Sequence, residues 1–199
     1  MHHRIITRAV LACAFTAALS YPAHAQTSSP VLREQITAAI GIKPGMIIGE
    51  GGAGRGAYTF SIAARVGETG RIYANDINAA ALAEIDSLCK VQGVKNITTV
   101  VGKPSDPLFP VKNLDMVFLR YVVHHMEDTT AWMKNVIPYM KPGALLILVE
   151  WDAGRAPVPD RPLITEQQLL DIMAKTDFVI DHIDRSFGND NIYFYKLKQ

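Results

Sequence analysis

The chain has 199 residues, of which 49% are hydrophobic, and its formal net charge at pH 7 is +1. This balance is that of an ordinary globular protein, and it lacks the surplus of basic residues with which a chain captures nucleic acid or an anionic membrane. With only Cys13 and Cys89, the chain offers no cysteine cluster for a metal ion, and we expect no bound metal.

The first 25 residues have the pattern of a cleaved export signal. Basic residues at the start precede an uncharged, mostly apolar run at residues 9–19, and residues 23–25 (AHA) supply the small side chains that a signal peptidase reads. The run is too short to cross a bilayer as a helix. We therefore expect cleavage after Ala25 and a soluble periplasmic protein with no stable membrane insertion.

A lipoprotein lipidated at Cys13 is the alternative, but Leu11 is bulky where a lipidation signal has a small residue. After a leader at residues 1–25, residues 26–30 form a polar linker. Residues 31–199 have the length of one domain with a full core.

The domain is expected to begin with a short helix over residues 31–40. A turn at residues 44–45 leads into a compact apolar strand at 46–48. A glycine-rich loop follows this strand, and a helix over residues 57–66 follows the loop.

The same alternation then repeats. A strand at residues 71–75 precedes a helix that Asn78 caps and Gly93 ends. Further strands are predicted at residues 97–101 and 114–119. A helix over residues 130–137 comes next, truncated by the proline at position 138.

In the last third of the domain, the alternation of strands and helices ends with two consecutive strands. Residues 144–149 are an unbroken apolar run, as in a central strand buried on both faces. Thr165 and Gln168 form a capping box for another helix. Two strands, at residues 178–183 and 192–197, then follow one another without a helix between them, which requires an antiparallel pair. The prediction is an α/β fold: a doubly wound, mostly parallel seven-stranded sheet with an antiparallel C-terminal strand and helices on both faces.

The glycine-rich loop is the first candidate binding site. Glu50 ends the first strand, and Gly52, Gly54 and Gly56 follow it at alternate positions. Glycines at this place let the backbone turn sharply and approach a ligand, and the next helix offers free amide donors. In doubly wound sheets, ligands bind at these carboxyl ends of strands.

Asp76 supports a nucleotide ligand. It follows the second strand, twenty residues after Gly56, where a carboxylate can accept hydrogen bonds from two ribose hydroxyls. We count the adjacent Ile77 among the cofactor-binding residues. The competing interpretation of Asp76 is a helix-start residue or a loop salt bridge.

Two cofactors fit the glycines alone. Residues 52–57 (GAGRGA) also match the dinucleotide pattern, so the glycines alone do not exclude a nicotinamide-dependent oxidoreductase. Glu50 distinguishes between the two cofactors, because the pyrophosphate of a dinucleotide would repel an anion at this position. An acid two places before three alternating glycines resembles the Asp/Glu-x-Gly-x-Gly-x-Gly signature of class I methyltransferases. That resemblance implies S-adenosylmethionine as the cofactor, with the carboxylate near its cationic methionine end.

The resemblance extends along the chain. Asp115 opens the fourth strand as in that family, and His124 and His125 resemble the paired histidines of the ubiquinone and menaquinone biosynthesis methyltransferases. Residues 140–144 (MKPGA) are similar to the turn before their fifth strand. The chain departs from the pattern at Lys103, where an acid usually contacts adenine. Asp106 is the candidate substitute, or else a turn residue.

The expected function is methyl transfer to a small-molecule acceptor. His124 and His125 are candidate general bases, with structural roles as the alternative. Glu150, Trp151 and Asp152 are candidate pocket residues, and Tyr121 and Arg161 are weaker candidates.

Two other functions stay open, a non-catalytic binder of the cofactor or a related nucleoside and an NAD(P)-dependent oxidoreductase. Export also conflicts with the cofactor, which is not normally abundant outside the cytoplasm. Either the cofactor reaches that compartment, or the leader is not used in this way, or the fold has lost its chemistry. The sequence predicts neither the acceptor nor the oligomeric state.

Overall fold

The computed structural model describes residues 29–155 and 163–198. The expected leader, residues 26–28 of the expected linker and Arg161 lie outside the described residues. Within them, no helix is both long enough and apolar enough to cross a membrane.

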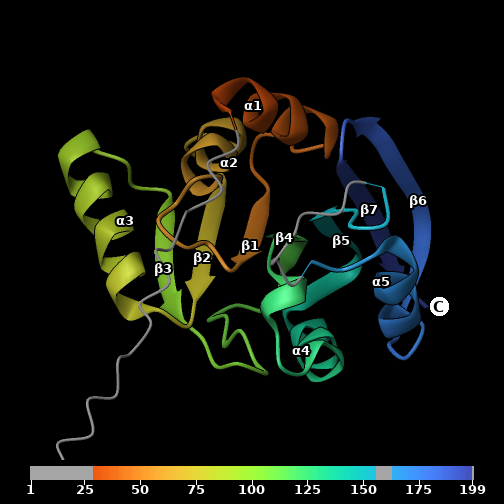
Figure 1. Cartoon of the computed structure of the whole chain (residues 1–199). Helices are drawn as coiled ribbons and strands as arrows, with labels where there is room; N and C mark the ends of the chain where they lie inside the picture. Colours follow the sequence, from red (N-terminus) through yellow and green to blue (C-terminus); the bar gives the residue numbers. More distant parts are fainter. Residues whose placement is uncertain (1–28, 156–162, 199) are drawn as a thin grey trace, which may run out of the picture.

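One sheet organises the described chain (Figure 1). Its strands are β1 (Ile47–Gly51), β2 (Arg71–Asp76), β3 (Ile97–Val101), β4 (Leu114–Arg120), β5 (Met140–Trp151), β6 (Phe178–Phe187) and β7 (Asp190–Leu197). The helices are α1 (Pro30–Ala39), α2 (Thr59–Val66), α3 (Ala79–Gln92), α4 (Thr129–Val136) and α5 (Glu166–Met173), with 3₁₀ turns η1 (Val123–His125) and η2 (Ile137–Tyr139).

The strand order is β3-β2-β1-β4-β5-β7-β6. Strands β1 to β5 are parallel to one another, whereas β7 pairs antiparallel with both β5 and β6. The predicted doubly wound sheet with an antiparallel C-terminal strand is confirmed. Because β1 lies between β2 and β4, the strand order reverses at the carboxyl end of β1, where doubly wound sheets bind ligands.

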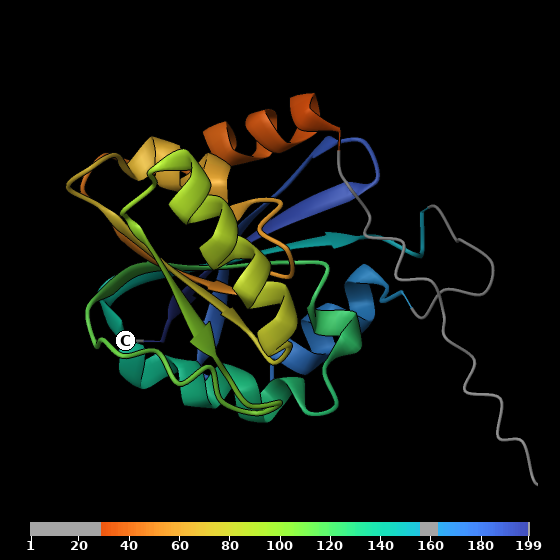
Figure 2. The ribbon, with the colours of Figure 1, turned by 90° about the vertical axis from the view of Figure 1, so that its left-hand side faces the viewer.

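Helices cover the sheet on both faces (Figure 2). Side chains alternate along each strand, so β4 sends Met116 and Phe118 to one face and Val117 and Leu119 to the other. The first face packs against α1, α2 and α3, and the second against α4 and α5. Each face therefore has its own apolar core, which holds the carboxyl ends of β1 and β4 in fixed positions.

Several predicted boundaries differ from the structure; for example, β1 extends to Gly51 rather than ending at residue 48. β5 begins at Met140 rather than at residue 144, because Met140 pairs with Leu114 before the register shifts at Met116 and Leu145. Gly143, with φ of +79°, lies in the bulge between them. The loop predicted between the last strands is a tight turn, since Phe187 already pairs with Asp190.

The capping box of α5 gives a test of local stability. The Thr165 hydroxyl accepts from the Gln168 amide at 3.2 Å, and the Gln168 side chain accepts from the Thr165 amide at 2.9 Å. Thr165→Ala removes the acceptor for the helix amide and should lower the free energy of unfolding by about 1 kcal/mol in urea titrations. Thr165→Ser keeps the hydroxyl and is the matched control, and equal losses in both variants would contradict the capping role.

Candidate functional site

The glycine-rich loop is held by the residues that end β2. The Ala53 amide donates to the Asn75 carbonyl at 2.9 Å, and the Gly54 amide donates to Oδ2 of Asp76 at 2.8 Å. Oδ1 of Asp76 accepts from the Asn78 amide at 2.9 Å, at the start of α3. Asp76 thus joins the loop to the next helix, and each of its oxygens retains a lone pair for a further donor.

Two glycines of the loop have different surroundings. Gly52 has a φ of +68°, and a Cβ there would lie 2.3 Å from Cγ2 of Val122. Gly54 has a φ of +54°, but a Cβ there would have no atom within 4 Å. Gly52 therefore packs on the segment after β4, whereas Gly54 borders open space that a ligand can occupy.

Glu50 is a buried acid at the end of β1. The residue is 4% exposed, and its Oε2 accepts a hydrogen bond of 2.6 Å from the Thr59 hydroxyl. Burial raises the pKa of the Glu50 carboxyl to about 8, against the lowering effect of Thr59 and with a smaller raising effect from Asp76. No Lys, Arg or His in residues 29–155 and 163–198 forms an ion pair with it. A bound cation would relieve this unfavourable burial.

The other predicted cofactor residues, Ile77, Gly56 and Asp106, have three different environments. Ile77 is 64% exposed beside Asp76, which leaves a large apolar surface free for a flat ligand. Gly56 has a φ of +84° and closes the loop by donating to the Ala53 carbonyl. Asp106 has the contacts of a turn residue, since its Oδ1 accepts from the Leu108 amide and from the Tyr139 hydroxyl. Its assignment to adenine stays a prediction.

His124 lies on η1, directly after β4, and contacts Glu150 at the end of β5. Its Nδ1 is 2.7 Å from Oε2 of Glu150, and the two side chains are only 5% and 2% exposed. Oε1 of Glu150 accepts from the amides of Val122 at 3.0 Å and Val123 at 2.9 Å. The structure therefore assigns Glu150 a contact with a candidate base that sequence patterns do not reveal.

His125 has a different environment. It is exposed, and its ring centroid lies 4.2 Å from that of His124. Partial burial, followed by the neighbouring His124, lowers the pKa of His125, while Glu150 has the opposite effect. No hydrogen bond orients its ring among the described residues, so His124 is the better fixed of the two candidate bases.

A second cluster joins the end of β4 to the start of β7. The Arg120 guanidinium lies 3.7 Å above the Tyr121 ring and 3.6 Å from Oδ2 of Asp190, and the Tyr121 hydroxyl donates to Oδ1 of that acid. Tyr121 has a φ of +56°, which non-glycine residues rarely adopt. Sequence reasoning missed Arg120 and Asp190, although a basic residue closing an apolar strand was an available signal.

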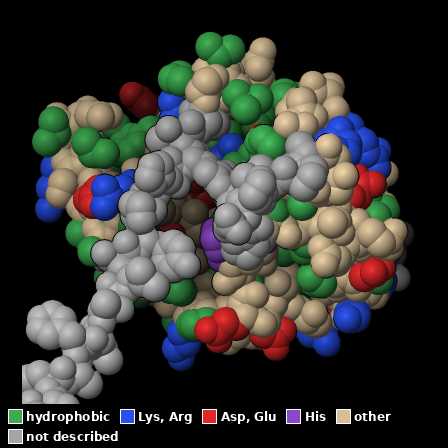
Figure 3. All heavy atoms as spheres, in the orientation of Figure 1, with side chains coloured by type: hydrophobic (Ala, Val, Ile, Leu, Met, Phe, Trp, Pro, Cys, Tyr) green, Lys and Arg blue, Asp and Glu red, His purple; other side chains and the backbone are tan. Residues whose placement is uncertain are grey.

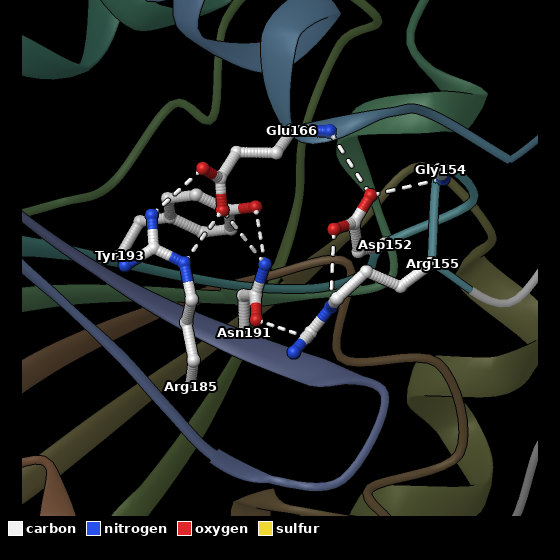
Figure 4. Close-up of polar contacts among 7 residues, drawn as sticks. All are labelled: Asp152, Gly154, Arg155, Glu166, Arg185, Asn191 and Tyr193. Atoms are coloured by element: carbon white, nitrogen blue, oxygen red, sulfur yellow. Dashed lines mark hydrogen bonds and ion pairs between the residues drawn. The ribbon is translucent and has the colours of Figure 1, made fainter.

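Asp152 organises a polar network (Figure 4), and its place in the acceptor pocket stays a prediction. One oxygen accepts from the amides of Gly154 and Glu166, and the other pairs with Arg155 at 3.1 Å. Arg155 also donates to Asn191, whose amide reaches Glu166 at 3.0 Å. This network fixes the chain after β5 to the start of α5 and to β7. Trp151, the last residue of β5, is partly exposed and pairs with Asp190 of β7.

The surface over these strand ends is hollowed. Figure 3 shows the recess near the middle of the face, beside the residues drawn in grey, with acidic and histidine side chains visible in it. Independently of that view, the parallel pairing of β1, β4 and β5 places Glu50, His124 and Glu150 at the same edge of the sheet.

Comparison with known proteins gives a family match. A profile described as a methyltransferase domain matches residues 48–143, from β1 to the bulge in β5. This part of the chain is therefore similar to the methyltransferases. The cofactor that this family implies is S-adenosylmethionine, and the predicted resemblance is confirmed.

Two curated relatives are similar to this chain, and one of them is named a methyltransferase. The chain is 32% identical to the uncharacterised protein YafE of Escherichia coli K12 over 120 residues, which are 60% of this chain and 56% of YafE. It is 24% identical to a ubiquinone/menaquinone biosynthesis C-methyltransferase, UbiE of Hydrogenovibrio crunogenus, over 59% of this chain and 47% of that protein. The chain thus spans about half the length of the curated relatives that it matches.

The fold agrees over a longer range. A crystal structure of an S-adenosylmethionine-dependent methyltransferase from Aquifex aeolicus superposes with a TM-score of 0.77 at 18% identity, covering 83% of this chain and 89% of that one. At this identity the match shows the methyltransferase fold, including the antiparallel β7.

The described residues fit the cofactor of this family. Glu50 is a buried acid without a cationic partner, and the cofactor carries an ammonium and a sulfonium group. Gly54 leaves space for a ligand against the loop, and both oxygens of Asp76 keep acceptor capacity for ribose hydroxyls. Glu50, Gly54 and Asp76 would therefore hold the methionine end and the nucleoside of the methyl donor.

The raised pKa of Glu50 predicts how the free energy of unfolding of the ligand-free chain depends on pH. Above about pH 4.5 the unfolded chain loses this proton, whereas the folded chain keeps it up to a pKa of about 8. The free energy of unfolding should therefore fall as pH rises through this window, with Glu50 contributing at most about 1.4 kcal/mol per pH unit. Glu50→Gln keeps the acceptor for Thr59 but cannot ionise, so the fall should become shallower in denaturant titrations. Identical pH profiles would contradict the buried, unpaired state of Glu50.

Proposed function

We propose that this chain catalyses S-adenosylmethionine-dependent methyl transfer to a small-molecule acceptor. The observation that supports it best is that two acids lie at the ends of neighbouring strands. Glu50 is buried without a cation, and Asp76 is held against the glycine-rich loop. A sulfonium nucleoside carries positive charge at one end and ribose hydroxyls at the other, and these two acids match both. The small-molecule acceptor is supported by the likeness to the ubiquinone/menaquinone biosynthesis C-methyltransferase of Hydrogenovibrio crunogenus.

S-adenosylmethionine supplies an electrophilic methyl group, so the protein's main task is to position an acceptor in a dry pocket. Such positioning can lower a barrier by roughly 7 to 11 kcal/mol in favourable intramolecular cases. The cores on both faces of the sheet keep the strand ends rigid, and Arg33 on α1 donates to the Ala57 carbonyl at 2.8 Å behind the loop. These contacts hold the cofactor-binding loop in one place.

His124 is the base in this proposal. It lies after β4, in the segment that packs against Gly52 of the cofactor loop through Val122. A histidine there can accept a proton from an acceptor that is protonated at working pH. His125 is exposed and lacks an orienting partner among the described residues, so we assign it no part in the proton transfer.

A thermal-shift series tests the proposal directly. A ligand present at a hundred times its Kd stabilises the folded chain by about 2.7 kcal/mol. We expect S-adenosylmethionine and its demethylated product to raise the melting temperature and NAD to leave it unchanged. Stabilisation by NAD alone would instead favour the oxidoreductase. Cofactor binding without transfer of a labelled methyl to any compound of a broad acceptor panel would favour the non-catalytic binder.

The role of Asp76 is tested by calorimetry with S-adenosylhomocysteine. Hydrogen bonds to a charged acceptor contribute about 1.5–3 kcal/mol each, so Asp76→Ala should weaken binding at least tenfold. Asp86→Ala is the matched control, because that acid lies on α3 and accepts only from the exposed Thr99 hydroxyl. Equal affinities of the wild type and Asp76→Ala would remove Asp76 from the site.

We also propose that the chain is exported to the periplasm. Support comes from the basic start, the apolar run and the small residues at 23–25. The mass of the protein recovered from a cell fraction checks this, since cleavage after Ala25 and an intact leader differ by the mass of 25 residues.

A further inference from the structure

Glu150 occupies an unusual position for an acid. It follows the apolar run of β5, is 1% exposed, and forms hydrogen bonds with three successive residues after β4. Oε1 faces the amides of Val122 and Val123, and Oε2 faces Nδ1 of His124. All of these donors belong to the turn that carries the candidate base, so Glu150 fixes both the backbone and the ring of that turn.

The contact determines which ring nitrogen carries the proton. A carboxylate only accepts hydrogen bonds, so the hydrogen in the 2.7 Å contact lies on Nδ1 of His124. A neutral imidazole has one N–H and one lone pair, which leaves the lone pair on Nε2. No other described residue forms a hydrogen bond with Nε2, so no described side chain or backbone group uses its lone pair.

We propose that Glu150 is a positioning residue that locks His124 with its proton on Nδ1, so that Nε2 accepts the proton of a hydroxyl group on the methyl acceptor. This inference rests on the proposed function of the site. In the step, the O–H bond of the acceptor breaks and its electron pair stays on oxygen. The proton moves to the Nε2 lone pair, and the resulting imidazolium is stabilised by the Glu150 carboxylate at Nδ1.

The acceptor class follows from the same geometry. A base is needed only where the acceptor holds its proton at working pH, which excludes thioethers and neutral tertiary amines. An ammonium acceptor would bring a second positive charge beside the cationic cofactor, which is electrostatically unfavourable. A weakly acidic hydroxyl, of the phenol or enol kind, approaches without charge and loses its proton to Nε2.

The substitution Glu150→Gln reverses the tautomer. Its amide oxygen must remain opposite the two backbone donors of Val122 and Val123, since an NH₂ group there would face two N–H groups. The NH₂ group then faces Nδ1 of His124 and donates to it, so the ring proton moves to Nε2. The variant thereby keeps the backbone contacts but converts the base nitrogen into a donor.

The test is a long-range ¹H–¹⁵N NMR measurement on the full chain, at a pH where the imidazole rings are neutral. The signals of His124 are assigned by their loss in His124→Gln. We expect Nδ1 to be protonated in the wild type and Nε2 in Glu150→Gln. Glu166→Gln is the matched control, because Glu166 belongs to the neighbouring network without contacting His124, and it should show the wild-type tautomer.

A wild-type His124 with its proton on Nε2 would overturn the proposal, and this measurement needs no variant to fold. An unchanged tautomer in Glu150→Gln would overturn it as well. Calorimetry with S-adenosylhomocysteine keeps the two proposals apart. Absence of cofactor binding in the wild type contradicts the proposed function, whereas normal binding with the wrong tautomer contradicts only the role of Glu150.

The acceptor class is tested with labelled S-adenosylmethionine and matched aromatic probes: 2-naphthol, its thiol analogue and its amine analogue. We expect transfer to the naphthol, on oxygen or on the conjugated ring carbon, and a 10²- to 10⁴-fold lower kcat in Glu150→Gln with an unchanged KM for the cofactor. Transfer to the thiol or amine alone, or to none of the three, counts against a hydroxyl acceptor.

Discussion

Burial of a carboxyl group at the end of each of two strands is the constraint on which the site depends. An acid removed from water needs donors or a cation, since an unpaired buried charge is strongly unfavourable. Glu150 receives three donors from the turn after β4. Glu50 receives one hydroxyl, and burial raises its pKa to about 8. The described residues therefore give one acid three donors and the other a single hydroxyl, without a cation.

Much of the fold follows from the sequence, because apolar runs, glycines and caps are local signals. Local patterns predict the existence and order of the seven strands, the glycine-rich loop after β1 and the capping box at Thr165. The start of β5 at Met140 was not predictable, since it depends on pairing with Leu114 across a bulge. Periodicity reports which face a residue occupies but not where a neighbouring strand begins.

The candidate site was likewise predictable only in part. Glu50 and Asp76 were predictable from spacing, because the parallel strands β1 and β2 bring their carboxyl ends together. The contact between Glu150 and His124 joins residues 26 positions apart in the chain. Asp190 reaches Tyr121 only because β7 is inserted antiparallel beside β5. Such contacts depend on side-chain directions in the assembled sheet, and no local pattern encodes them.

The close approach of Gly52 to Val122 has a consequence for the evolution of this protein. A Cβ at Gly52 would lie 2.3 Å from the Val122 side chain, so the glycine-rich loop and the turn that carries His124 are in close contact with no space between them. A lineage that reshapes this turn for a new acceptor must therefore keep glycine at position 52 and a side chain no larger than valine at position 122. Diversification of acceptor choice is expected to arise from surrounding segments, while this junction stays constant.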